Sequence, residues 1–193
     1  MPAHTPGRRI SVVGCSGSGK TTLARRLAQH LGYRHIELDA LYHQPNWQPL
    51  PKEQFKQAVS DALRGDDWVV EGSYSAVRPH VLERSDMVIW LDLPKAVVMR
   101  QVLWRTLRRL VNNEELWNGN RERWGNLLKL NPRQSILVWT WQRHAVYRQR
   151  YGEEMLNSSP QQPYLRLTSR QAVERFLSSL QAQRAVLSRA PEP

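Results

Sequence analysis

Hydrophobic residues follow two alternating patterns along this chain. Short, nearly continuous apolar runs, such as Ile10–Val13 and Met87–Leu91, are typical of strands in a parallel sheet that is covered on both faces. Between these runs, apolar residues recur every three or four positions, as on the buried face of a helix; Leu23, Leu27 and Leu31 form one such series. The alternation predicts an α/β fold with a doubly wound parallel sheet.

The two patterns also place the individual elements. Strands are expected at residues 10–13, 34–39, 68–72, 87–92 and 164–167. Helices are expected at 23–31, 51–63, 95–109 and 135–151, and a closing helix begins after a cap at Thr168 or Ser169. Residues 40–49 form an aromatic loop punctuated by proline, and residues 112–125 show no clear periodicity.

The length of 193 residues suits one domain with a substantial core. We expect a single domain over residues 1–193, with its core at about 8–181, an insertion at about 105–131 and flexible termini that include a fraying tail from about Ala185. There is no run of eighteen apolar residues to indicate a membrane span, and Met1–Gly7 lacks the apolar segment of a signal peptide. With a single cysteine, Cys15, the chain forms no internal disulfide, and a cytoplasmic location is expected.

A glycine-rich segment between the first strand and the first helix carries the clearest chemical signal. It matches the phosphate-loop pattern G-x-x-x-x-G-K-[ST], with a strand before it and a helix after it. Glycines allow the backbone to wrap a phosphate, so that amide groups and the helix N-terminus face the negative charge. The predicted ATP-binding residues are Gly14, Cys15, Ser16, Gly17, Ser18, Gly19, Lys20, Thr21 and Thr22.

Two residues of the loop have individual roles in this pattern. Lys20 is expected to reach the β- and γ-phosphates, and the Thr21 hydroxyl is expected to ligate Mg²⁺. Cys15 lies near a helix N-terminus that would lower its pKa. We nevertheless interpret Cys15 as a small residue of the loop rather than as a redox switch. The loop predicts ATP and Mg²⁺ as cofactors.

Acidic residues close two of the predicted strands. Asp39 ends the predicted second strand, and Glu71 lies at the end of the third, followed by Gly72, at the edge where open α/β sheets place their ligands. The aromatic loop after Asp39 is either the wall of an acceptor pocket or a cap over the core, and the sequence leaves both interpretations open. The candidate acceptor-binding residues are Tyr42, Trp47, Tyr74 and Arg78.

The chain is strongly basic, with a formal net charge of +11. Ten arginines lie between Arg100 and Arg150, where there are only three acidic residues. Such an excess favours either a nucleic-acid partner or cations that surround a phosphoryl group in transfer, and composition does not separate the two. The aperiodic segment 112–125 lies within the insertion and resembles a lid between two helices.

Five stretches together resemble one known group of proteins. The chain is similar to the adenylate-kinase-like branch of P-loop kinases, and within it to bacterial proteins described as DNA topology modulation proteins. The resemblance covers roughly residues 8–180, and its more specific motifs are Trp-Val-Val-Glu-Gly-Ser-Tyr and Glu-Leu-Trp-Asn-Gly-Asn-Arg. The stretches that carry it are Gly14–Thr22, Leu38–Trp47, Trp68–Tyr74, Ser85–Pro94 and Glu115–Glu122.

The resemblance implies the three-layer sandwich of P-loop NTPases. This fold has a five-stranded parallel sheet with helices on both faces and a helical, arginine-rich lid. The resemblance also places the third strand beside the phosphate-loop strand, which brings Glu71 near Mg²⁺. Relatives commonly have Asp-Gly at Glu71-Gly72, so the longer glutamate favours contact with the metal through water. For Asp92, at the end of the fourth strand, we favour a structural role in a turn.

The reaction expected from these residues is in-line transfer of the γ-phosphoryl group of Mg-ATP to a nucleotide or small metabolite. Asp39 would orient or deprotonate an acceptor hydroxyl, whereas the phosphate of a nucleotide acceptor needs no base. The candidate catalytic residues are Lys20, Asp39, Glu71, Arg105 and Arg121, with Arg100 and Arg143 as further lid candidates.

The alternative is an ATP-dependent nucleic-acid-binding or regulatory protein with little small-molecule kinase activity. Five tryptophans between Trp104 and Trp141 and the net charge of +11 favour it, but no helix-turn-helix or zinc motif is present. The sequence does not indicate an oligomeric state. The kinase is the interpretation that we favour.

Overall fold

A parallel five-stranded sheet forms the centre of the computed structural model, which describes residues 7–127, 131 and 135–187. The strand order is β2-β5-β1-β6-β7, and every neighbouring pair is parallel. The predicted sheet is therefore confirmed, including the position of β5 beside β1. The strands are β1 (Arg9–Gly14), β2 (Arg34–Glu37), β5 (Trp68–Glu71), β6 (Met87–Leu91) and β7 (Tyr164–Leu167).

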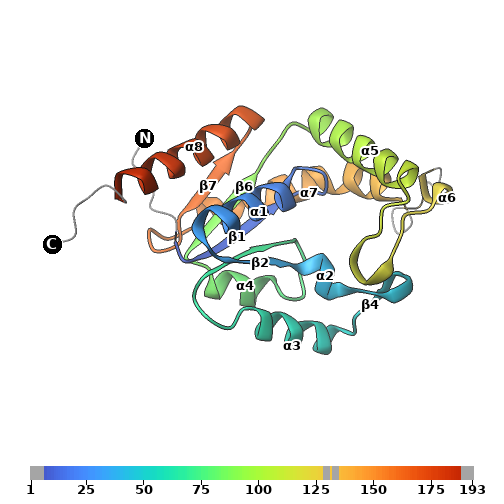
Figure 1. The fold of residues 1–193 in the computed structure, drawn as a ribbon, viewed down its shortest axis with the longest axis horizontal. Coiled ribbons are helices and arrows are strands. Elements are labelled where there is room, and N and C mark those ends of the chain that lie inside the picture. Colours follow the sequence, from blue (N-terminus) through green and yellow to red (C-terminus); the bar gives the residue numbers. More distant parts are fainter. Residues whose placement is uncertain (1–6, 128–130, 132–134, 188–193) are drawn as a thin grey trace.

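Helices cover both faces of this sheet (Figure 1). On one face, α1 (Lys20–Leu31) and α8 (Arg170–Leu187) pack on the strands, and on the other α3 (Lys52–Ala62), α4 (Arg78–Arg84) and α7 (Ile136–Leu156) do so. Helix α5 (Lys95–Val111) runs beside α7. The expected three-layer P-loop architecture is confirmed.

Strand β1 shows why its sequence is nearly continuously apolar. Successive side chains of a strand point to opposite faces, so Val12 packs with α1 and α8 while Val13 packs with Tyr151 of α7. Both faces are buried, and therefore both sets of positions are hydrophobic. At roughly 25 cal/mol per Å² of buried apolar surface, this double coverage is the main stabilising contribution to the sheet.

The second predicted strand is shorter than expected. Strand β2 ends at Glu37, and Asp39 lies in the first turn of a short helix, α2 (Leu38–Tyr42), where the prediction of a strand to residue 39 was wrong. Leu38 turns into the core against Val70 and Phe55, which ends the extended backbone, and an acidic residue is favourable in the first turn of a helix.

The aromatic loop 40–49 also has more regular structure than expected. It contains a small antiparallel hairpin of β3 (His43–Gln44) and β4 (Gln48–Pro49), joined by the 3₁₀ turn η1 (Pro45–Trp47). We call residues 43–49 the acceptor hairpin, because they lie in the loop for which an acceptor pocket is one of the two sequence-based interpretations. Residues 112–123, which follow α5, are called the lid loop; they contain the 3₁₀ turn η2 (Trp117–Gly119) and precede α6 (Trp124–Leu127).

The C-terminal part agrees with the pattern except in length. Helix α7 continues to Leu156, five residues beyond the predicted end. Ser169, one of the two predicted cap residues, caps α8: its hydroxyl accepts a hydrogen bond from the Ala172 amide at 3.1 Å. Helix α8 extends to Leu187, and the rest of the predicted tail, like the predicted N-terminal segment before Gly7 and part of the insertion, lies outside the described residues. None of the described helices is long and apolar enough to cross a membrane.

Candidate active site

The phosphate loop lies between β1 and α1 and packs directly against α5. Gly17 has a left-handed φ of 79°, and a Cβ built there would lie 2.8 Å from Cβ of Val102 on α5. Only glycine meets both requirements. The same packing brings the later residues of α5 next to the loop.

Two side chains of the loop are suited to bind an anion. The Lys20 ammonium donates to the Cys15 carbonyl at 3.1 Å, which holds it along the loop. The Ser18 hydroxyl is buried and has no hydrogen-bond partner in the described part of the chain. With the N-terminus of α1 beside them, these donors fit the phosphates of a nucleotide.

Thr21 and Glu71 meet at the carboxyl end of the sheet. The Thr21 hydroxyl donates to Glu71 Oε1 at 2.7 Å, so its lone pairs stay free for a cation. Burial raises the pKa of Glu71, although Lys20 and the Thr21 hydrogen bond oppose this rise. Within the described residues no group of three or more His, Cys, Asp or Glu side chains is placed to hold a metal. A hydroxyl and one carboxylate suit Mg²⁺, which keeps several of its waters.

Arg105 of α5 reaches the phosphate loop. Its Nη2 lies 3.4 Å from the Ser16 hydroxyl, and its Nε has no hydrogen-bond partner among the residues that the structure describes. Burial, helped by the neighbouring Arg109, lowers the pKa of Arg105, while Glu122 opposes the shift. A guanidinium with a free donor at the loop is suited to stabilise phosphate charge.

Asp39 of α2 lies beside Tyr74 and His43. Its Oδ1 accepts a hydrogen bond from the Tyr74 hydroxyl at 2.6 Å, and His43 Nε2 lies 3.4 Å from the same hydroxyl. Asp39 is close enough to Glu71 and Arg105 to raise the pKa of Glu71 and to oppose the lowering at Arg105. The structure thus brings Asp39, Glu71 and Arg105 around one phosphate loop.

The aromatic residues around Asp39 form one cluster. The Tyr42 ring lies 4.6 Å from the Tyr74 ring and 5.1 Å from the His43 ring, and Trp47 packs edge-on to His43 at 5.2 Å. The predicted acceptor residues Tyr42, Trp47 and Tyr74 therefore lie together beside Asp39.

Arg78 and Arg121 are engaged elsewhere. The Arg78 guanidinium forms two hydrogen bonds with Glu154 of α7 and lies 4.6 Å from the centre of the Tyr151 ring. Arg121 pairs with Glu115 and with the Asn113 carbonyl, within the lid loop. The structure does not bring either guanidinium to the phosphate loop. Of the further lid candidates, Arg100 is exposed and Arg143 stacks on Trp139 at 4.7 Å.

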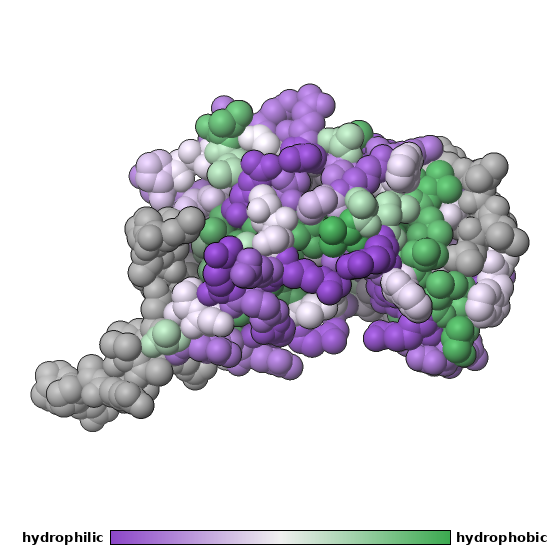
Figure 2. Space-filling model, turned by 90° about the horizontal axis from the view of Figure 1, so that it is seen from above, coloured by the Kyte–Doolittle hydropathy of each residue, from purple (hydrophilic) through white to green (hydrophobic). Residues whose placement is uncertain are grey.

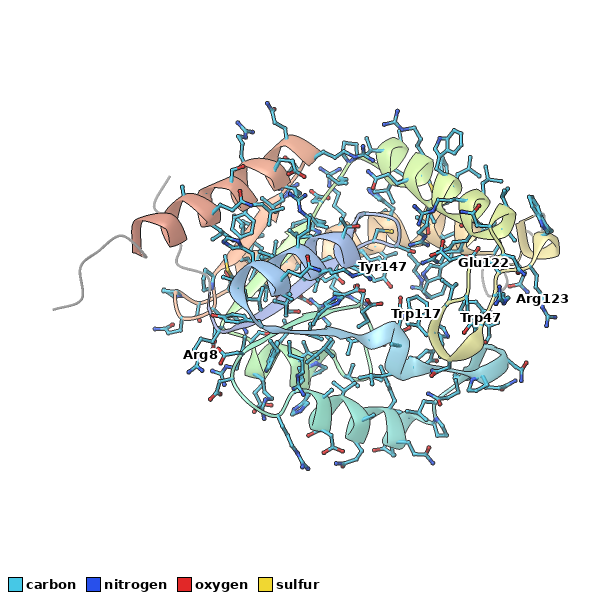
Figure 3. All side chains as sticks on the ribbon, viewed as in Figure 1. Arg8, Trp47, Trp117, Glu122, Arg123 and Tyr147 are labelled. Atoms are coloured by element: carbon cyan, nitrogen blue, oxygen red, sulfur yellow. The ribbon has the colours of Figure 1, made fainter. Side chains whose placement is uncertain are left out.

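The lid loop is bound to the acceptor hairpin, a contact that the sequence did not predict. The Asn120 side chain accepts from the Trp47 amide at 2.7 Å and donates to the Gln44 carbonyl at 2.9 Å. The Trp117 indole donates to Glu37 Oε2 at 2.9 Å and stacks on His43. Figure 3 shows Trp47, Trp117 and Glu122 together where the lid loop meets the hairpin.

The sequence marked two of these residues as parts of a specific motif, but it did not indicate their contacts. Trp117 and Asn120 belong to the specific motif Glu115–Glu122, but the motif gave them no role. The ion pair of Arg109 with Glu122, at 3.2 Å, ties α5 to the same loop. Arg109 and Glu122 are thirteen positions apart in the chain, so the spacing of residues along a helix did not reveal their ion pair.

The surroundings of Cys15 and Asp92 suit structural roles for both residues. The Cys15 thiol is buried, lies 3.7 Å from the Thr140 carbonyl of α7, and has its pKa raised by burial. Asp92 accepts two hydrogen bonds from Arg166 of β7 and lies 3.4 Å from the Arg148 guanidinium. Asp92 thus joins the ends of β6 and β7, in line with a turn role.

Several proteins whose sequences are similar to this chain are kinases. A family model described as an AAA domain matches residues 10–186. The shikimate kinase of Thermosynechococcus vestitus is 30% identical over 138 residues, which cover 64% of this chain and 73% of that protein. The cytidylate kinase of Thermococcus kodakarensis is 29% identical over 138 residues, which cover 61% of this chain and 69% of that protein.

Solved structures show the same architecture. A shikimate kinase from Acinetobacter baumannii in complex with shikimate has a TM-score of 0.51 and 18% identity, and the match covers 97% of each chain. A gluconokinase from Sinorhizobium meliloti has a TM-score of 0.50 and 20% identity, covering 95% of this chain and 96% of that one. At these identities the likeness shows the fold.

Proposed function

The chain belongs to the AAA-domain family of P-loop kinases, and from that premise we propose that it transfers the γ-phosphoryl group of ATP to a hydroxyl group of a small metabolite. The observation that carries this proposal is the position of Asp39. Its carboxylate lies on the acceptor side, close enough to Glu71 and Arg105 to interact with both electrostatically. A carboxylate there suits an acceptor that must lose a proton.

The proposed roles follow from where the side chains lie. The loop amides, Lys20 and the Ser18 hydroxyl bind the donor phosphates, and Arg105 stabilises charge on the transferring group. Asp39 accepts the proton of the acceptor hydroxyl, whose oxygen attacks the γ-phosphorus as the bond to ADP breaks.

Mg²⁺ fits the pair formed by the Thr21 hydroxyl and Glu71. Thr21 would hold the ion directly and Glu71 would hold one of its waters, because the glutamate already accepts from Thr21. When bound, the ion would neutralise charge on the donor phosphates. ATP and Mg²⁺ are therefore the proposed cofactors.

The acceptor side argues for a hydroxyl compound rather than a nucleoside monophosphate. A nucleotide acceptor needs a cation for its phosphate, and Arg78, one of the predicted acceptor-binding residues, is paired with Glu154. The relatives named above include kinases of both shikimate and cytidylate, so the family admits either class.

A finer placement in the bacterial group described as DNA topology modulation proteins is also proposed. It rests on the motifs Trp68–Tyr74 and Glu115–Glu122, which here hold Glu71 and Tyr74 at the site and Trp117 and Asn120 at the lid. The motif residues serve the kinase site, so we do not extend the proposal to a nucleic-acid-binding activity.

The test is transfer from γ-labelled Mg-ATP to two sets of acceptors, hydroxyl metabolites and nucleoside monophosphates. The wild-type protein is expected to label a hydroxyl compound, and Asp39→Asn is expected to lower kcat about 100-fold or more, since it removes a general base. Labelling of a monophosphate that survives Asp39→Asn would overturn the proposal, because that acceptor needs no base.

A further inference from the structure

Tyr74 is brought to Asp39 by the turn that follows β5. Gly72 in this turn has a φ of 138°, and a Cβ built there would lie 2.7 Å from Cβ of Leu38 at the start of α2. The backbone after β5 therefore runs against the first residue of the helix that carries Asp39. This close approach places the hydroxyl of Tyr74 2.6 Å from Asp39 Oδ1.

The Tyr74 side chain is fixed by its surroundings. Its ring packs against Tyr42 at 4.6 Å and against Phe55 at 5.1 Å, in the core cluster on this side of the sheet. Burial raises the pKa of Tyr74 well above its ordinary value, and the Asp39 carboxylate adds to the rise. The phenol therefore keeps its proton near neutral pH and remains a donor.

His43 lies on the other side of the same hydroxyl, with Nε2 at 3.4 Å. Burial lowers the pKa of His43, although Asp39 opposes this, so the ring is neutral near pH 7. With its proton on Nε2, the imidazole donates toward Tyr74, and Tyr74 donates to Asp39. The three groups then form a line of donors that ends on one carboxylate oxygen.

We propose that Tyr74 is a positioning residue for Asp39: its hydroxyl occupies Oδ1 and thereby directs Oδ2 toward the acceptor hydroxyl. The inference rests on the proposed kinase function and names a residue that serves the base rather than the substrate. In the step itself, the O–H bond of the acceptor breaks and its proton passes to Asp39 Oδ2. The acceptor oxygen forms the new bond to the γ-phosphorus, and the electron pair of the broken P–O bond leaves with ADP.

Other charged groups lie near Asp39 and also affect the stability of its charged form. Glu71, from β5, repels the carboxylate, whereas Arg105, from α5, attracts it. Burial lowers the pKa of His43, which favours its neutral form, and Tyr74 supplies the hydrogen bond. Removal of that hydrogen bond takes away a donor that stabilises the charged form of the carboxylate.

The experiment compares Tyr74→Phe with Tyr33→Phe. The first variant keeps the packed ring and loses only the hydroxyl. The second loses a hydroxyl near Asp67, which precedes β5, at the opposite end of that strand from Glu71. Tyr74→Phe is expected to lower kcat roughly tenfold, as for a lost hydrogen bond to a charged group, with KM for ATP unchanged. The acidic side of its pH–rate profile moves to higher pH, while Tyr33→Phe matches the wild type. A purely structural role would leave the pH profile where it is, and that result would overturn the proposal.

A second measurement does not depend on turnover. The side-chain carboxyl of Asp39 is followed by ¹³C NMR in protein labelled at aspartate and assigned with Asp39→Asn. Its titration is expected to shift to higher pH in Tyr74→Phe and to stay unchanged in Tyr33→Phe. If no acceptor is labelled, the proposed function fails, yet this titration still tests the contact. If transfer occurs and the titration is unmoved by Tyr74→Phe, only the present inference fails.

Discussion

Glu71 carries a carboxylate at a place where the fold excludes most of the water. It is the last residue of a central strand and accepts a hydrogen bond from Thr21. Burial raises its pKa, so the folded chain holds the Glu71 proton more tightly than the unfolded chain does. The charged form therefore destabilises the protein without metal, which is expected of a group retained for function.

The pH dependence of this destabilisation gives a prediction. It is absent below the ordinary pKa of 4.5 and grows as pH rises through the higher pKa of the folded state. In the presence of a chelator, Glu71→Gln should raise the free energy of unfolding at pH 8 by about 1 kcal/mol or more, and should have little effect near pH 4. Urea denaturation at the two pH values measures this.

The control is Glu53→Gln, which removes an exposed carboxylate of α3. It should change stability by less than about 0.5 kcal/mol at both pH values. An equal gain from Glu71→Gln at pH 4 and pH 8 would contradict the account of a buried charge. The same variant should lower transfer activity, because the metal waters lose a charged acceptor.

Cys15 is also buried, and here burial argues against reactivity. Its thiol faces the Thr140 carbonyl, and its raised pKa keeps it protonated near pH 7. Because the chain has one cysteine, the experiment is simple. Reaction with a thiol reagent should be slow in the folded protein and fast in urea, followed by mass spectrometry. Rapid native modification at pH 7 would restore the redox interpretation.

At the scale of elements, the lid loop and the acceptor hairpin act on each other. Trp47 has a left-handed φ of 59°, which is rare for a bulky residue and costs about 1 kcal/mol or more. Its amide is bound by Asn120 and its indole N–H donates to the Arg121 carbonyl at 3.1 Å. These contacts with the lid loop offset the strain, so the hairpin conformation depends on the lid.

Loss of the Asn120 side chain should therefore loosen both segments. Asn120→Ala is expected to lower the local opening free energy of the hairpin by about 1–3 kcal/mol, since buried hydrogen-bonding groups lose their partner. Hydrogen exchange of residues 43–49 and 113–122 measures this. ATP hydrolysis should rise relative to transfer, because an open lid admits water.

The matched control is Asn112→Ala, which changes an exposed side chain at the C-terminal end of α5. It should leave exchange in the hairpin unchanged. Equal exchange in Asn120→Ala and the wild type would show that the lid loop and the hairpin are independent.

The sequence predicted the elements better than it predicted the contacts between them. Continuous apolar runs gave the sheet strands, because both faces are buried, and helical spacing gave the long helices. The acceptor hairpin was missed because its strands have two residues each, too short for a period. Helix α7 was cut short because Gly152 and the charged residues after Tyr151 interrupt its apolar spacing.

The site was predictable where one local motif specifies it. The phosphate loop is such a motif, and the end of β5 placed Glu71 beside it. Arg78 shows the limit, because its partner Glu154 is 76 positions away in the chain and belongs to another helix. Nor does any local pattern join Asn120 to Gln44, which are also 76 positions apart.

Across the whole molecule, the described arginines include two groups, those that form ion pairs between elements and those that are exposed on the surface. Some arginines join elements through ion pairs: Arg26 of α1 binds Glu174 of α8, and Arg78 of α4 binds Glu154 of α7. Others are exposed on the outer face of α5, where Arg100 and Arg108 flank Trp104, which is 67% exposed. The face seen in Figure 2 is mainly hydrophilic, but it also has a band of hydrophobic residues toward the right of the view.

The exposed cations predict how salt should act. Association with single-stranded DNA through this surface should weaken tenfold or more between about 50 and 200 mM salt, as counterion release requires. Phosphoryl transfer to a small acceptor should change by less than about twofold over the same range, since its charges lie in the site. Stimulation of ATP turnover by DNA in place of a small acceptor would favour the regulatory alternative.

The proposed activity of this chain is the transfer of a phosphoryl group from ATP to a small acceptor. Its most direct test is a balance of products from γ-labelled Mg-ATP with a panel of acceptors, for the wild type, Lys20→Ala and the surface variant Lys52→Ala. We predict that the wild type and Lys52→Ala form ADP and one labelled phosphate ester in equal amounts, and that Lys20→Ala forms neither. Formation of ADP and inorganic phosphate alone, with every acceptor unlabelled, would contradict the account.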